Sequence, residues 1–253
     1  MDPLTWRHGK RRRSKRSPAL PWSIAGVAVL AILAIALTVA ALRSGPAAPN
    51  VADFTPKPMP TQTQLPRAAF LGDSYIEGYG ATANTIPAQV SKAMNWQMFA
   101  MGQSGTGYLA DGGGGARAPY PGRSSGVPAK SSVVMISGGL NDVKLYPQNP
   151  GAFRAAVRET IGNAKTAAPD AKVVVVGIYW PYPDVTSDVE EMNTIILESA
   201  RDLGAMTIDP LGESWMSTMA ADGLLQDDKY HPNQAGYDYL ATRLVSAIQA
   251  LGI

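Results

Sequence analysis

The sequence contains two histidines, and they stand in different surroundings. His8 lies in a basic run near the N-terminus, whereas His231 is preceded three residues earlier by Asp228. A serine hydrolase needs a base that titrates near neutral pH and a carboxylate that orients it. An Asp-x-x-His segment supplies both within one turn. A surface Asp and His ahead of a C-terminal helix would give the same pattern, so this pair needs partners elsewhere in the chain.

Three other polar segments offer such partners, each after an apolar run. The segment Leu-Gly-Asp-Ser at 71–74 ends in Ser74, where a nucleophile would have its backbone N–H free to face an oxyanion. Gly105 lets the backbone approach a substrate closely, and the amide of Asn141, in Gly-Gly-Leu-Asn-Asp at 138–142, can donate to an oxyanion. Taken singly, each segment also fits an ordinary turn, helix cap or polar loop.

A further segment, Gly-Arg-Ser-Ser-Gly at 122–126, stands apart from these four and matches the Gly-x-Ser-x-Gly elbow of another hydrolase class. That elbow requires a strand before its serine and a helix after it. Prolines at 119, 121 and 128 flank the match, so we interpret Ser124 as a chance occurrence. The segment lies in a Gly- and Pro-rich stretch, 106–131, that is expected to form a loop at the rim of the site.

The elements that must position these residues alternate between strands and helices. The predicted strands are 68–71, 96–100, 133–136, 172–178 and 206–208. Three helices are predicted from apolar residues that recur on one face. These faces are Phe153, Val157, Ile161 and Ala164; Val189, Met192, Ile196, Ala200 and Leu203; and Leu240, Leu244, Ile248 and Leu251. A capping box of Ser187 and Glu190 precedes the second helix. This alternation predicts an α/β domain with a parallel sheet and helices on both faces. The polar segments then fall at the carboxyl ends of strands, where such sheets bind ligands.

The four segments, in this order and at strand ends, resemble the four blocks of the SGNH (GDSL-like) hydrolases over residues 67–253. The resemblance implies a flavodoxin-like three-layer α/β/α sandwich. It implies a catalytic triad of Ser74, Asp228 and His231, and an oxyanion hole made by the N–H groups of Ser74 and Gly105 and the side chain of Asn141. The first block has Tyr75 where the common Gly-Asp-Ser-Leu motif has leucine. Asp73 and Asp142 belong to the motifs but are interpreted as supporting residues.

The N-terminal quarter of the chain has a different composition. Residues 1–16 carry seven Lys or Arg against one Asp, whereas 67–253 carries thirteen against eighteen Asp or Glu, a net charge of −5 that speaks against nucleic-acid binding. Residues 21–42 contain no charge and are long enough to cross a bilayer. The positive-inside rule places 1–20 in the cytoplasm as a basic tail, and makes 21–42 a transmembrane signal-anchor. A cleaved signal peptide, which would release the protein, is the alternative.

Residues 43–66, rich in proline, predict an extended linker to a hydrolase domain at 67–253. The chain contains no cysteine, and no ligand pattern predicts a metal or a cofactor. We therefore expect a single-pass membrane protein whose extracytoplasmic serine esterase removes a short acyl group, such as acetyl, from a cell-envelope or extracellular carbohydrate. Tyr108, Tyr120, Trp180 and Tyr182 are candidate sugar-stacking residues, and ordinary core packing or a place in a loop explains them at least as well. A lipid esterase or lysophospholipase, an acyltransferase with the same triad, and a non-catalytic binding module are the alternatives.

Overall fold

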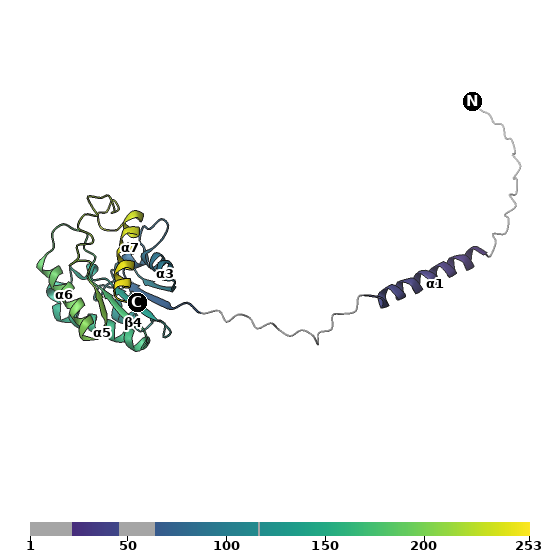
Figure 1. Cartoon of the computed structure of the whole chain (residues 1–253), viewed down its shortest axis with the longest axis horizontal. Helices are drawn as coiled ribbons and strands as arrows, with labels where there is room; N and C mark the ends of the chain where they lie inside the picture. Colours follow the sequence, from purple (N-terminus) through teal and green to yellow (C-terminus); the bar gives the residue numbers. More distant parts are fainter. Residues whose placement is uncertain (1–21, 46–63, 116) are drawn as a thin grey trace, which may run out of the picture. The chain divides into compact units, whose positions relative to one another are not determined.

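The structure is a computed structural model, and it describes residues 22–45, 64–115 and 117–253. The chain divides into two units, residues 1–61 and 62–253, and each is described by itself (Figure 1). The predicted basic tail, 1–20, and most of the predicted linker, 46–63, lie outside the described residues.

The larger unit is built on a five-stranded parallel sheet. Its strands are β1 (Arg67–Gly72), β2 (Gln97–Gly102), β3 (Val133–Ser137), β4 (Lys172–Val176) and β5 (Met206–Ile208). Their order is β2-β1-β3-β4-β5, the flavodoxin-like order. All five predicted strands are confirmed. The β-branched runs form β3 and β4, where all but Lys172 are buried, as expected of strands covered on both faces.

Helices cover both faces of the sheet and complete three layers. On one face α3 (Ile86–Met94) packs against α7 (Gln234–Ala250), and on the other α5 (Pro150–Ala167) packs between α4 (Tyr120–Ser124) and α6 (Ser187–Asp202) (Figure 1). The flavodoxin-like α/β/α sandwich is therefore confirmed. The predicted apolar faces of α5, α6 and α7 point into the core, with only Leu203 and Leu251 partly exposed.

One helix start differs from the prediction. The N-cap of α6 is Thr186, whose hydroxyl accepts a hydrogen bond from the N–H of Val189, so the predicted capping box led by Ser187 is wrong. Ser187 is already the first helical residue. The chain offers two adjacent hydroxyl side chains, and either satisfies the sequence preference for an N-cap.

The smaller unit contains α1 (Trp22–Arg43). Apart from Ser23, Thr38 and Arg43, its sequence is apolar on every side of the helix, because Ala, Val, Leu and Ile occur in every turn. Among the described residues, α1 is the one helix long and apolar enough to cross a membrane. That length and composition suit both a membrane anchor and a signal sequence near the N-terminus.

Candidate active site

Ser74 lies where strand β1 ends and a one-turn helix, α2 (Ser74–Glu77), begins. Asp73 caps this helix, because its Oδ1 accepts a hydrogen bond from the N–H of Tyr75 at 2.9 Å. As the first residue of α2, Ser74 has no intrahelical acceptor for its own N–H. The helix lies directly on the end of β2, where a Cβ at Gly102 would come within 2.1 Å of the backbone nitrogen of Glu77. Only glycine at 102 permits this approach.

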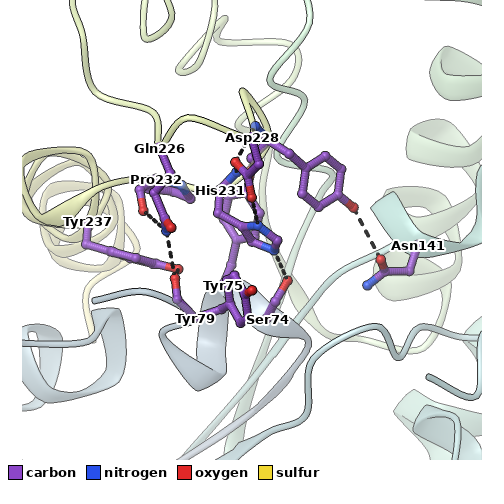
Figure 2. Close-up of polar contacts among 10 residues, drawn as sticks. Ser74, Tyr75, Tyr79, Asn141, Gln226, Asp228, His231, Pro232 and Tyr237 are labelled. Carbon is purple, nitrogen blue, oxygen red and sulfur yellow. Dashed lines mark hydrogen bonds and ion pairs between the residues drawn. The ribbon is translucent and has the colours of Figure 1, made fainter. Parts of the chain in front are cut away.

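The base predicted from the sequence meets the serine across 157 residues of chain. Nε2 of His231 lies 3.0 Å from Oγ of Ser74, and Nδ1 lies 2.6 Å from Oδ2 of Asp228 (Figure 2). An ionised carboxylate can only accept, so Nδ1 carries the proton and Nε2 presents a lone pair to the hydroxyl. The three predicted triad residues thus form one hydrogen-bonded chain.

Asp228 organises its own turn as well as the ring of His231. Its Oδ1 accepts from the N–H groups of Tyr230 and His231, both at 2.9 Å. Partial desolvation raises the pKa of Asp228, but the hydrogen bonds from the His231 ring and from these N–H groups outweigh it and hold the pKa below its usual range. Asp228 is therefore an ionised acceptor at neutral pH.

Asn141 lies in the turn η2 (Leu140–Asp142) beyond the end of β3. Its Nδ2 donates to the carbonyl of Thr106 at 2.9 Å, and its Oδ1 accepts from the hydroxyl of Tyr230 at 3.2 Å. Because Oδ1 is engaged by a donor, the amide has a fixed orientation, and one hydrogen of Nδ2 remains for another acceptor.

Gly105 lies beside Asn141 in the loop after β2 and has a positive φ of 75°. Two charged side chains fix the residue before it. Glu77 accepts from both the N–H and the hydroxyl of Ser104, and Arg117 donates to the carbonyl of Ser104. Because Glu77 ends α2, the helix that starts at Ser74 also fixes the Gly105 loop.

Asp142 and Asp73, the two other motif aspartates, are buried and structural. Asp142 accepts from the N–H groups of Tyr108, Leu109 and Ala110 at 2.8–2.9 Å. Burial raises the pKa of Asp142, and these three N–H groups oppose the rise. Burial likewise raises the pKa of Asp73 to about 7. Asp142 holds the loop at 108–110, and Asp73 caps the helix that begins at the serine.

The stretch 106–131 differs in part from the loop predicted. It contains α4, and Ser124, at the end of that helix, is fully buried with its hydroxyl donating to the carbonyl of Pro121. Ser124 does not follow a strand. Tyr108 and Tyr120 pack in the core, 5.0 Å apart between ring centroids, so the expectation that these two stack on sugars is wrong. Both tyrosines lie in a Gly- and Pro-rich segment, but burying their large apolar rings in the core stabilises the fold.

Several residues of the site were missed by sequence reasoning. Tyr75 and Tyr230 adjoin the predicted motifs, Glu77 lies three residues after the serine, and Arg123 donates to the carbonyls of Met101 and Gly72 at the ends of β2 and β1. For Glu77, the sequence signal was a charged side chain three residues after Ser74. The tyrosines carried no signal of their own.

The sequence model of the GDSL-like lipase/acylhydrolase family matches residues 70–239, from strand β1 into helix α7. The chain belongs to this family. The match includes Ser74, Gly105, Asn141, Asp228 and His231. As a GDSL-family protein the chain is an ester hydrolase. It is also 29% identical over 203 residues to a GDSL lipase of Mycobacterium tuberculosis, an alignment that covers 76% of this chain and 85% of that protein.

Two solved structures show the same fold as this GDSL-family chain. A salicylyl-acyltransferase from a tetracycline biosynthetic pathway has a TM-score of 0.60 at 18% identity, covering 76% of this chain and 56% of that one. An acetyl xylan esterase from Geobacillus stearothermophilus has a TM-score of 0.53 at 15% identity, covering 70% of this chain and 92% of that one. At these identities the likeness concerns the fold alone.

Proposed function

We propose that this chain is a membrane-anchored serine esterase in which Ser74, His231 and Asp228 form the catalytic triad. The observation that carries this proposal is the hydrogen-bonded chain from Ser74 Oγ through both ring nitrogens of His231 to Asp228. His231 takes the proton of the Ser74 hydroxyl as Oγ attacks the ester carbonyl. Asp228 keeps the ring in the tautomer that can accept this proton and stabilises the imidazolium that results.

The proposed oxyanion hole consists of the N–H groups of Ser74 and Gly105 and the free hydrogen of Asn141 Nδ2. These donors are held before the reaction, by the start of α2, by the Glu77 contact with Ser104, and by the Tyr230 contact with Asn141. Prepositioned donors stabilise the developing negative charge without reorganising. The intermediate then expels the alcohol, which takes the proton from His231, and water releases the acid by the same steps.

A groove of about 700 Å³ next to the proposed triad supports a carbohydrate as the alcohol part of the substrate. Its lining includes Asn141, Asp228, Tyr230, Lys144, Trp180 and Tyr182. The rings of Trp180 and Tyr182 lie 5.0 Å apart, and Tyr182 is 43% exposed. Aromatic faces carry partial negative charge and attract the C–H face of a sugar ring. The acetyl xylan esterase among the similar folds acts, by its name, on an acetylated carbohydrate.

The groove assignment predicts a split between two substrates. Trp180→Ala and Tyr182→Ala should raise KM for an acetylated oligosaccharide about 10-fold or more, while kcat/KM for p-nitrophenyl acetate changes less than about 3-fold, because that ester has no sugar to stack. Phe99→Ala, which removes a 42% exposed aromatic from strand β2, is the control. Equal losses on both esters would contradict a sugar-binding groove.

The N-terminal quarter of the chain supports a proposal for the location of the protein. We propose that 21–42, which includes most of α1, anchors the protein, that the basic residues 1–20 stay in the cytoplasm, and that 43–66 links the anchor to a hydrolase domain at 67–253 outside the membrane. The supporting features are an uncharged helix of bilayer length and the basic run that precedes it.

Acyl transfer is the second candidate function, because one of the similar folds is a salicylyl-acyltransferase. A transferase would pass the acyl group from Ser74 to a sugar hydroxyl instead of water. Incubation with a panel of esters of increasing acyl length, with and without an acceptor sugar, separates these possibilities by product analysis. Hydrolysis proportional to enzyme, with short acyl groups preferred and no acylated acceptor, is the expected result. Preference for long acyl chains would instead favour a lipid substrate.

A further inference from the structure

Tyr75 takes the place of the leucine that follows the common Gly-Asp-Ser motif, and it makes a contact that leucine cannot make. Its ring is buried, 1% exposed. Its hydroxyl donates to the backbone carbonyl of Tyr230 at 2.6 Å, across 155 residues of chain. This carbonyl belongs to the residue immediately before His231. The residue after the proposed nucleophile is therefore bonded directly to the segment that carries the base.

Tyr230 continues the connection toward the third motif. Its ring packs edge-on against the imidazole of His231, with centroids 4.7 Å apart. Its hydroxyl donates to Oδ1 of Asn141 at 3.2 Å. Two tyrosines in series thus connect the helix that starts at Ser74, the turn that carries His231, and the amide proposed for the oxyanion hole.

We propose that Tyr75 and Tyr230 are positioning residues for ester hydrolysis. Tyr75 sets the distance between Ser74 and the turn that carries His231, because its rigid ring fixes the distance between α2 and the carbonyl of Tyr230. Tyr230 sets the orientation of the Asn141 amide, because a hydroxyl hydrogen on Oδ1 keeps Nδ2 directed toward the substrate. The inference rests on the proposed triad and names two residues outside it.

A neighbouring tyrosine distinguishes positioning from packing. Tyr179 stacks face to face on Tyr75, with centroids 5.6 Å apart and ring planes within 6°. It is 3% exposed, about as buried as Tyr75, but its hydroxyl has no hydrogen-bond partner within the described part of the chain. Tyr75→Phe and Tyr179→Phe therefore each remove one hydroxyl from the same stacked pair of rings. Only Tyr75→Phe also removes a hydrogen bond to the segment that carries His231.

The experiment compares Tyr75→Phe, Tyr230→Phe and Tyr179→Phe in the full-length protein, purified in detergent, with p-nitrophenyl acetate as substrate. Small misplacements of catalytic groups cost up to about 100-fold in rate. We expect Tyr75→Phe to lower kcat about 10- to 100-fold and Tyr230→Phe about 10-fold, with KM within about 3-fold. The rate of Ser74 labelling by a fluorophosphonate should fall in parallel. Tyr179→Phe should keep kcat within about 2-fold.

The outcomes separate the two claims. If wild-type protein is not labelled at Ser74, the proposed triad fails. If it is labelled but Tyr75→Phe and Tyr230→Phe both match Tyr179→Phe in kcat, the positioning role is wrong while the triad stands. Should Tyr75→Phe fail to fold, Tyr230→Phe decides alone, since its hydroxyl lies beside the open groove and its loss spares the core.

Discussion

His231 has both ring nitrogens occupied, Nδ1 by Asp228 and Nε2 by the hydroxyl of Ser74. Asn141 has its oxygen occupied by Tyr230 and one amide hydrogen by Thr106. These contacts leave the proposed nucleophile next to the proposed base and, among the described residues, one hydrogen of the Asn141 amide without an acceptor. At the scale of residues, hydrogen bonds within the protein engage most polar atoms of the site, and the remaining donors and acceptors are available to a substrate.

Asp228→Asn and Asn141→Ala test the two halves of this arrangement. In Asp228→Asn the acceptor of the Nδ1 hydrogen weakens and the wrong tautomer becomes accessible, so kcat should fall about 10²- to 10⁴-fold. Asn141→Ala removes one of three proposed donors and should cost about 10²- to 10³-fold, mainly in kcat. Steady-state kinetics on one soluble ester measures both. An Asn141→Ala variant with raised KM and normal kcat would show that the amide binds the ground state instead.

The order of four short segments along the chain predicted the candidate site residues. The structure brings two of these segments, 71–74 and 228–231, into one hydrogen-bonded chain of Ser74, His231 and Asp228. The sequence predicts no role for Tyr75. Its partner, the carbonyl of Tyr230, is a backbone atom 155 residues away, and local sequence carries no information on where a buried hydroxyl finds its acceptor. Such contacts depend on how two loops meet over the sheet.

At the scale of elements, the loops beyond β1, β2 and β3 are held by buried carboxyl groups. Asp142 accepts three N–H groups of the chain between Tyr108 and Ala110. Asp73 is buried and caps α2, where its Oδ1 accepts a hydrogen bond from the N–H of Tyr75. Burial without a full set of donors favours the protonated form, which is why the pKa of Asp73 rises to about 7.

Asp73 therefore makes stability depend on pH in a defined direction. Its pKa is about 7 in the folded protein, against the ordinary value of 3.8 for an aspartate in an unfolded chain, so the folded state keeps a proton that the unfolded chain releases. Protonation of Asp73 therefore stabilises the folded state. This stabilisation is fully present below about pH 4 and is lost as pH rises through about 7. Asp73→Asn stays neutral and keeps an acceptor for the N–H of Tyr75. It should stabilise the fold at pH 8 by about 2–4 kcal/mol and by almost nothing at pH 4.

Urea unfolding of wild type, Asp73→Asn and the exposed control Asp170→Asn between pH 4 and pH 8 measures this difference. The control should show no comparable trend with pH. An Asp73→Asn variant less stable than wild type at pH 8 would mean that Asp73 is ionised and usefully paired in the folded state.

The strands and long helices followed from periodicity, because β3, β4, α5, α6 and α7 each carry a continuous or helical apolar pattern. The segment 106–131 has no such pattern. Its buried tyrosines are placed by contacts with α5, such as the edge-on packing of Tyr108 on Phe153 at 5.6 Å, and not by local sequence. The short helix α4 depends on the same tertiary contacts.

At the scale of the whole molecule, charge and composition differ between the N-terminal quarter of the chain and residues 67–253, as expected if these are an anchor region and a separate hydrolase domain. The basic residues before α1 carry a net charge of +6, and 67–253 carries −5. The core of the larger unit is formed by its own sheet and helices. This arrangement fits a self-contained enzyme joined to a membrane by a separate segment.

A fragment comprising 67–253 should be soluble, monomeric and active without detergent. Its sheet and core involve no residue of α1 among those described. Size-exclusion chromatography and kcat/KM relative to the full-length protein in detergent are the measurements, with values within about 3-fold expected. Aggregation that is relieved by restoring 21–42 would contradict a separable domain.

The central claim is that Ser74 is acylated and that His231 activates it. Treatment of the full-length protein with a fluorophosphonate probe, followed by digestion and mass spectrometry, tests it most directly. We expect a single adduct on the peptide containing Ser74, present in wild type and in Ser124→Ala and absent in Ser74→Ala. In His231→Ala it should form at least about 10³-fold more slowly. Labelling at Ser124, or unchanged labelling in His231→Ala, would contradict it.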